Sequence, residues 1–274
     1  MFPQLAPLAR TTTRLHPRAG SPTPYDSSIG GPLLWPSSQP WPYCDKWHEG
    51  PVSPMVPVAQ LYVRDVPELP KPGRADLLQV LWCPSEHPPF YKPTTKLAWR
   101  TAADVTDILD TPPTPADPQY GYLPTPCVIS PEQVTEYPNF LELSEQLREQ
   151  VNDWSTWRAA GIAMDDDYEE PQEYYSDELS EAPGWKVGGW PPWGLTDPAP
   201  RFCINCGTVM APLLTIASEE SRDYRRGWLP TEDQGIAVID DDPVHNPPGI
   251  QVSKSNHLQF YLCRTCSNHT TLIQ

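Results

Sequence analysis

Four cysteines in the last third of the chain form two pairs with the spacing of zinc ligands. Cys203 and Cys206 are separated by two residues, and Cys263 and Cys266 repeat that spacing. Zinc prefers a tetrahedral shell, and two thiolates at this spacing reach one ion from a single tight turn. Gly207 can adopt the positive φ that such a turn needs. The residues therefore predict a four-cysteine zinc site; the alternatives are a redox dithiol and ordinary buried cysteines.

Two further pairs combine a cysteine with a histidine. Cys44 precedes His48 by four positions, and Cys83 precedes His87 by the same distance. Each pair alone is a weak signal, but together they predict a zinc site of two cysteines and two histidines; the alternative is that these cysteines are core residues. Neither shell leaves an open position for water, so both metals are expected to support folding. Cys127 has no partner and is expected to be a buried thiol.

Similar phrases precede the two ligand sets. "SSIGGPLLWP" starts at residue 27 and "WKVGGWPPW" at residue 185, each with a Gly-Gly pair before proline and tryptophan. A ligand pair, a strand-like segment, a second such segment and another ligand pair follow each phrase in the same order. This order aligns Cys44 with Cys203 and Cys83 with Cys263. We therefore expect an internal duplication of two β units, each stabilised by a knuckle-type zinc site.

The composition predicts the elements that must position these ligands. The chain has 38 prolines among 274 residues, which disfavours long helices, yet its 11 tryptophans and 12 tyrosines are atypical of disorder. β-Branched and aromatic runs between Pro and Gly clusters favour a mainly β, or β-rich α+β, fold. The segments expected as strands are 55–66, 76–84, 96–105, 211–218 and 257–265.

One helix is expected, at 139–157, where leucines, Val151 and Trp154 form a one-sided apolar stripe. We expect this helix to connect or brace the two units. The expected divisions are a basic N-terminal extension at 1–26, a first β repeat at 27–130, a connecting helix with an acidic linker at 131–184, and a second β repeat at 185–274.

The segment 165–181 is strongly acidic, with nine acids in seventeen residues and no base. It is either a solvated linker or a landing site for a basic peptide, in which carboxylates pair with Arg or Lys and tyrosines supply flat contact area. A second candidate contact surface is an aromatic floor beside the Gly-Gly pair at 188–189, whose alternative is a packed corner. The candidate partner-binding residues are Tyr168, Tyr174, Tyr175, Trp185, Trp190 and Trp193.

The formal net charge of −16 bounds the partners. An acidic surface repels phosphate, so a broad nucleic-acid interface is not expected, whereas a basic protein partner is. No run of 18 apolar residues is present that could span a membrane, and the first residues lack the apolar region of a secretory signal. We therefore expect a cytoplasmic protein. The triple Asp240–Asp242 lacks the spacing of a calcium loop.

Together these motifs resemble a known family. The phrases "SSIGGPLLWP", "MVPVAQLYV", "LLQVLWC", "WKVGGWPPW" and "HLQFYLC" resemble the bacterial YwqG-like proteins, a family of unknown function. The second half is also distantly similar to the eukaryotic programmed cell death protein 2 family, in which a Gly-Gly-Trp-Pro phrase and CxxC knuckles recur. Members of that family act as dedicated chaperones of a small-subunit ribosomal protein. The resemblance implies that the four cysteines of the second unit are zinc ligands.

The expected function is that of a non-enzymatic protein-binding module, a chaperone-like holder of a basic protein client. One alternative is an immunity protein that neutralises a basic toxin. The other is an enzyme with a pocket between the repeats, although HExxH, Walker A and nucleophile-elbow motifs are absent. The residues that could supply acid–base groups to such a pocket are Trp47, Glu86, His245 and His257.

Overall fold

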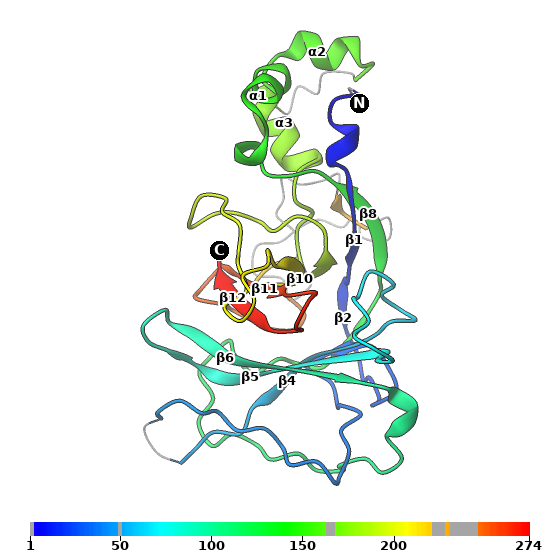
Figure 1. The fold of residues 1–274 in the computed structure, drawn as a ribbon, viewed down its shortest axis with the longest axis vertical. Coiled ribbons are helices and arrows are strands. Elements are labelled where there is room, and N and C mark those ends of the chain that lie inside the picture. Colours follow the sequence, from blue (N-terminus) through cyan, green and yellow to red (C-terminus); the bar gives the residue numbers. More distant parts are fainter. Residues whose placement is uncertain (1–2, 49–50, 163–167, 221–227, 231–245) are drawn as a thin grey trace.

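The computed structural model describes residues 3–48, 51–162, 168–220, 228–230 and 246–274. This part of the chain is mainly β, with two antiparallel sheets of six strands and a group of short helices (Figure 1). The strands are β1 (Arg10–Arg14), β2 (Pro17–Ala19), β3 (Ser28–Ile29), β4 (Val56–Tyr62), β5 (Leu77–His87), β6 (Lys92–Arg100), β7 (Cys127–Ile129), β8 (Glu132–Glu136), β9 (Lys186–Gly188), β10 (Ala211–Ala217), β11 (His257–Leu262) and β12 (His269–Ile273). The helices are α1 (Glu145–Val151), α2 (Trp154–Ala159) and α3 (Pro171–Glu178), and the 3-10 turns are η1 (Ala6–Leu8), η2 (Ala102–Asp104) and η3 (Phe140–Glu142).

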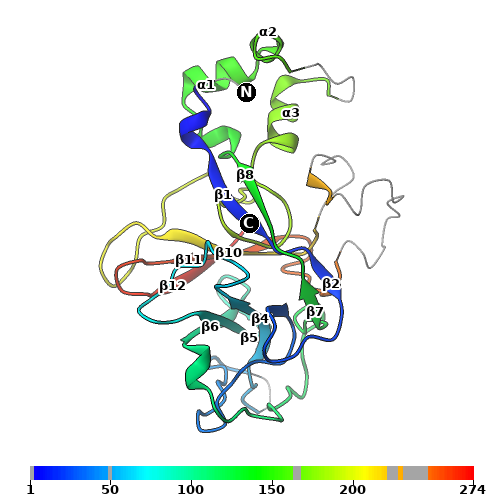
Figure 2. The same ribbon diagram turned by 90° about the vertical axis from the view of Figure 1, so that its right-hand side faces the viewer.

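The two sheets have matching strand orders. Sheet A runs β12-β11-β10-β9-β1-β8, and sheet B runs β6-β5-β4-β3-β7-β2 when read from its far edge. Strand β1 therefore lies in the sheet of the C-terminal strands, and β7 lies in the sheet of the N-terminal strands. The chain passes from one sheet to the other between β1 and β2, and again between β7 and β8 (Figure 2).

The first 26 residues, expected as a basic extension, instead contribute to both sheets. Arg14 of β1 is buried, and its guanidinium donates to the backbone oxygens of Pro183 and Trp228. Arg10 lies 3.3 Å from the ring centre of Trp190. The arginines that made this segment look like a solvated extension are therefore part of the folded structure.

The helix expected at 139–157 is divided into η3, α1 and α2. Ser144 caps α1 by accepting from the N–H of Leu147, and Asp153 caps α2 by accepting from the N–H of Ser155. Each cap residue has an extended backbone, which ends any continuous helix at that point. The apolar residues of the predicted stripe are therefore distributed over three separate elements.

These short helices pack together with α3 and the N-terminal turn η1 as a helical cap, defined here as residues 3–8, 137–162 and 168–182. The cap has its own apolar cluster, and it projects from one end of the sheets (Figure 1). Its buried side chains are Leu5, Tyr137, Leu143, Val151, Trp157 and Tyr175. Helix α3 occupies most of the described part of the segment expected as an acidic linker.

Both sheets contribute to one main core. Val58 and Val80 of sheet B pack in the same cluster as Val187, Ile216 and Phe260 of sheet A. Cys127 of β7 is fully buried, as expected, and burial raises the pKa of its thiol to about 11. Among the described residues, none of the helices has the length and apolar character needed to cross a membrane.

Candidate metal centres

The four cysteines of the second unit meet at the ends of β10 and β11. The Sγ atoms of Cys203 and Cys266 are 3.4 Å apart, and Cys206 lies 3.5 Å from Cys263 and 3.9 Å from Cys266. All four sulfurs lie within 4.8 Å of one another. A tetrahedral shell with Zn–S bonds of about 2.3 Å places its sulfurs about 3.8 Å apart. The cluster has the size of one metal ion's thiolate shell.

The two cysteines and two histidines of the first unit also converge. His87 Nε2 is 3.4 Å from Cys44 Sγ and 3.3 Å from Cys83 Sγ, and His48 Nε2 is 3.6 Å from Cys83 Sγ. With metal–nitrogen bonds of about 2.0–2.1 Å, a tetrahedral shell predicts S···N separations of about 3.6 Å. Both histidines present Nε2, so the described geometry matches a shell of two thiolates and two imidazoles.

The same backbone hydrogen bonds hold the first cysteine of each unit. The N–H of Cys44 donates to Ser53 O, and the N–H of Cys203 donates to Thr208 O, both at 2.9 Å. The turn between these partners is longer in the first unit. In the first unit the second ligand is His48, and in the second unit it is Cys206. The longer turn leaves room for the longer side chain of the histidine.

Backbone N–H groups also approach the ligand sulfurs. The N–H of Lys46 lies 3.5 Å from Cys44 Sγ, and the N–H of Asn205 donates to the equivalent Cys203. Burial raises the pKa of Cys203, but this bond and its neighbours outweigh burial and lower the pKa to about 6. Two positions after the first cysteine, each turn thus presents a donor that stabilises a thiolate.

The two centres differ in burial. Cys44 and Cys83 are both buried, whereas Cys206 and Cys266 are exposed. Burial, followed by the neighbouring Cys44, raises the pKa of Cys83 to about 12. Burial also lowers the pKa of His87, which keeps its ring neutral, the form that binds a metal.

The candidate partner-binding aromatics do not form an open floor. Trp185 and Tyr175 are core residues with 1 % and 0 % of their surface exposed, which favours a packing role over a contact role for these two residues. Trp185 packs in the main core between the sheets. Trp190 is half-buried and is covered by Arg10. Trp193 is half-buried and donates its indole N–H to Glu142 over 3.2 Å.

The two remaining tyrosines lie in the helical cap. Tyr168 and Tyr174 are half-buried and meet edge to face, with ring centres 5.5 Å apart. Residues 165–167 of the acidic segment, the triple Asp240–Asp242 and His245 lie outside the described residues.

Three of the four groups considered for an enzyme lie in the described residues, on separate elements of the chain. Trp47 is 82 % exposed, and Glu86 accepts a hydrogen bond from the hydroxyl of Tyr122. His257 begins β11 in the other sheet, where its backbone pairs with that of Gln274.

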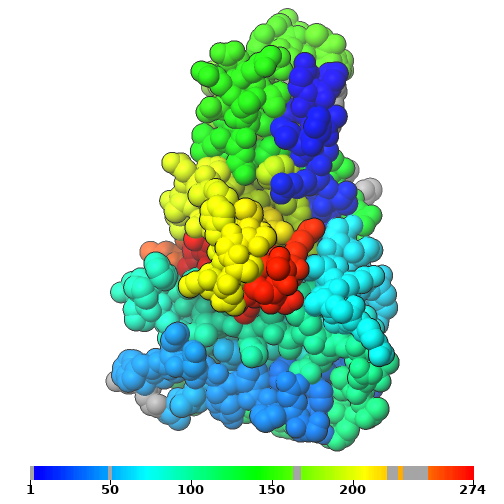
Figure 3. All heavy atoms as spheres, viewed as in Figure 1, coloured from blue at the N-terminus to red at the C-terminus, as the bar shows by residue number. Residues whose placement is uncertain are grey.

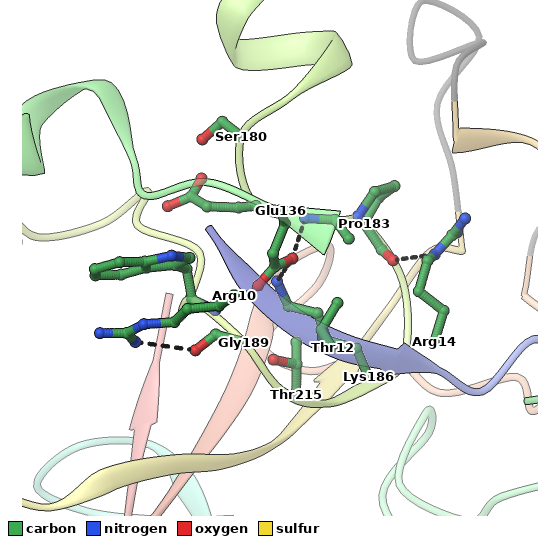
Figure 4. Close-up of polar contacts among 12 residues, drawn as sticks. Arg10, Thr12, Arg14, Glu136, Ser180, Pro183, Lys186, Gly189 and Thr215 are labelled. Atoms are coloured by element: carbon green, nitrogen blue, oxygen red, sulfur yellow. Dashed lines mark hydrogen bonds and ion pairs between the residues drawn. The ribbon is translucent and has the colours of Figure 1, made fainter. Parts of the chain in front are cut away.

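A buried ion pair, which no local sequence pattern predicts, links two strands of sheet A, β8 and β9, beside the cap. Lys186 Nζ lies 2.7 Å from Glu136 Oε2, and both side chains are fully buried. Glu136 also accepts from the backbone N–H groups of Ala182 and Trp190. Figure 4 shows Lys186 and Glu136 meeting over β1, between Arg10 and Arg14. These partners are far apart in sequence, so no local spacing could reveal them.

The two clusters could each hold a metal ion. No family model matches the chain, and no curated protein matches its sequence. The function of the chain is therefore inferred from its own geometry and charge.

Proposed function

We propose that the protein is a non-enzymatic, chaperone-like holder of a basic protein client, stabilised by two structural zinc ions. The observation that carries this proposal is the charge of the helical cap. The described residues 137–162 and 168–182 contain 10 acidic and 2 basic side chains, a net of −8 in a chain whose total is −16. Half of the net charge is therefore concentrated on one projecting element.

The acids of the cap are available to a partner. Glu145, Glu149, Glu169 and Glu173 are all exposed, and none of the ion pairs found among the described residues involves them. Carboxylates pair strongly with Arg and Lys, and a concentrated field speeds the approach of an oppositely charged partner. A basic protein segment is the partner that this surface favours.

Zinc is the proposed metal at both centres. Tetrahedral sets of four thiolates, or of two thiolates and two imidazoles, favour zinc over magnesium or calcium, which prefer oxygen. Both shells are complete with protein ligands, as in structural rather than catalytic zinc sites. Each ion would fix two turns of a proline-rich chain, and in this reading a reducing cytoplasm keeps the thiols available.

We also propose that the two units arose by duplication, with exchange of the first strand between sheets. The matching strand orders support this. A further support is that β4 and β10 shift register at equivalent positions, after Pro57 and after Pro212. The second glycines of the two phrases also approach equivalent parts of the chain, since Gly31 lies against Pro22 just after β2 and Gly189 lies against Glu136 at the end of β8.

The resemblance to the YwqG-like and programmed cell death protein 2 families is part of this proposal, and the chaperone role of the second family agrees with it. The alternative hypothesis, an immunity protein, uses the same acidic surface but has a different partner, a basic toxin in place of a cellular client. The enzyme hypothesis has less support, because among the described residues Trp47 is exposed in a loop, and Glu86 and His257 lie in different sheets.

Isolation of partners tests the proposal. The tagged full-length chain, purified from its own host at moderate salt, should retain one basic protein that is released at high salt. Glu145→Gln, Glu149→Gln and Glu169→Gln together should reduce the retained amount at least tenfold, because three exposed charges are lost without removing a helix cap.

The matched control is Asp104→Asn, Asp110→Asn and Asp117→Asn, which removes three exposed acids outside the cap. This variant should retain the partner as the unchanged protein does. Equal retention by both triple variants, or no basic protein at all, would contradict the proposal. A retained basic toxin whose activity is blocked would favour the immunity reading instead.

A further inference from the structure

The turns that carry the four cysteines of the second unit also carry apolar side chains that the fold leaves in solvent. Ile204 lies between Cys203 and Cys206 and is 91 % exposed. Phe202 and Val209 face each other as a bridged pair and are 60 % and 57 % exposed. Because the sulfurs draw the backbone together, a turn of this length cannot fold over to cover its own tip.

Acids are absent from the chain around these turns. Residues 198–218 and 246–274 contain no Asp or Glu, although the whole chain has 35. The same segments carry Arg201 and Arg264, and Arg264 is an exposed residue of the second turn, between Cys263 and Cys266. This face therefore has the opposite character to the helical cap.

A cation from the other sheet adds to this region. Lys92 of β6 donates to the backbone oxygen of Thr271 in β12. Burial, and then the positive charge of Arg201, lowers the pKa of Lys92. The two cations therefore lie near each other.

We propose that this knuckle face, formed by Phe202, Ile204, Val209 and Arg264, docks a peptide segment of a partner that carries acidic side chains beside apolar ones. The apolar tips would bury apolar side chains of the segment, and the arginines would pair with its carboxylates. Charge complementarity selects this occupant, since the acid-free face lies on a chain that is otherwise strongly acidic.

A nucleic acid fits the face less well. Sites for single strands combine several cations with aromatic side chains that stack on bases, whereas two of the three exposed tips here are aliphatic. The net charge of −16 also opposes an approaching phosphate backbone.

The knuckle face is separate from the helical cap. In Figure 1 the helices occupy one end of the molecule, and strands β10 to β12 lie below them. Figure 3 shows the yellow segment around residue 200 and the red C-terminal residues in contact at the surface, apart from the green helices. The protein could therefore hold an acidic segment and a basic client at the same time, and each binding event can fail without the other.

Selection from a random peptide library displayed on phage tests the proposal, with the zinc-loaded full chain as target. The enriched peptides should combine Asp or Glu with Leu, Ile or Phe. In fluorescence anisotropy, Ile204→Asp and Arg264→Glu should each weaken an enriched peptide at least tenfold. The matched controls are Val52→Asp and Lys46→Glu, which alter exposed residues on the first unit's turn and should change affinity less than twofold.

Zinc content and melting temperature, measured on every variant, separate loss of binding from loss of the turn. Enrichment of basic peptides, or affinity that Ile204→Asp and Arg264→Glu leave unchanged, would overturn the proposal. The proposal would also be overturned if a decamer of uridine bound the chain and Arg264→Glu abolished that binding. Dimers in sedimentation equilibrium that Ile204→Asp dissociates would overturn it as well. None of these results bears on whether the helical cap captures the basic client.

Discussion

Replacing Gly189 with alanine tests how the cap is joined to the sheets. Gly189 has a φ of +68°, and a Cβ placed on it would overlap Glu136 Oε1 and lie 2.8 Å from Thr12 Cβ. The carboxylate would have to leave its position, and the buried ammonium of Lys186 would lose this bond to Glu136. Gly161 is the matched control, because its φ is +80° and a Cβ there would meet nothing within 4 Å.

The two substitutions share one penalty and differ in the other. A left-handed backbone costs a non-glycine residue about 1–2 kcal/mol at either position. Breaking a buried ion pair from one side costs about 3–5 kcal/mol, since the remaining charge stays buried. We therefore expect Gly161→Ala to lower the free energy of unfolding by about 1–2 kcal/mol and Gly189→Ala by about 4–7 kcal/mol, the sum of the two penalties.

Urea unfolding of the zinc-loaded chain measures this difference. With an m-value of about 3 kcal/mol/M, a difference of about 3 kcal/mol separates the two midpoints by about 1 M. Equal midpoints would refute the reasoning, because they would mean that the carboxylate and its partners tolerate the methyl group. A variant with Lys186→Met and Glu136→Leu provides a further control, since the effect of Gly189→Ala should shrink when no buried charge is stranded.

Three further predictions concern the metals, one buried acid and one tryptophan. The purified chain should contain two zinc ions by elemental mass spectrometry, and Cys206→Ser or His48→Ala should each remove one. Burial raises the pKa of Glu220 to about 7, so the folded chain binds a proton that the unfolded chain releases near pH 4.5, and stability falls as pH rises across this interval. Relative to wild type, Glu220→Gln should gain about 2–3 kcal/mol in urea unfolding between pH 5 and pH 8. Trp185→Ala should cost about 3–5 kcal/mol in the same assay, because it empties a fully buried site.

Each of these predictions has a contrary outcome. One zinc ion in the unchanged chain would remove the first-unit site. A stability difference between Glu220→Gln and wild type that does not change with pH would mean that the carboxyl is ionised in the fold. Trp47→Ala is the control for Trp185→Ala, and a similar loss at this 82 % exposed position would show that the assay does not report core packing.

The residues of both metal clusters could be predicted from the sequence because their signal is local. Cys203 and Cys206 must share a turn to share an ion, and that requirement fixes their spacing whatever the rest of the fold does. Four of the longer strands were also predictable, since β4, β5, β10 and β11 are runs of apolar residues bounded by turn-forming ones.

The placement of β1 among the C-terminal strands could not be predicted in the same way. Strand β1 consists of three threonines between two arginines, a pattern typical of an exposed segment, and Arg14 is buried only because distant backbone oxygens receive it. The ion pair of Lys186 and Glu136 could not be predicted for the same reason. Its partners come from β9 and β8, which lie on either side of β1 in the folded sheet.

The connections between strands at matching positions of the two sheets differ greatly in length. Strands β2 and β3 are joined by residues 20–27, whereas the equivalent strands β8 and β9 are joined by residues 137–185. The longer connection contains the helical cap and most of the net charge. If the sheets descend from one duplicated unit, the cap is an addition to the second copy alone. A role that depends on the cap would then belong to the asymmetric part of the chain, while the sheets and both metal centres position it. Shortening this connection to the length of its counterpart, with Lys186→Met to avoid a stranded charge, should leave both zinc ions bound and abolish retention of the basic client. Loss of zinc in that variant would show instead that the cap is part of the fold's support.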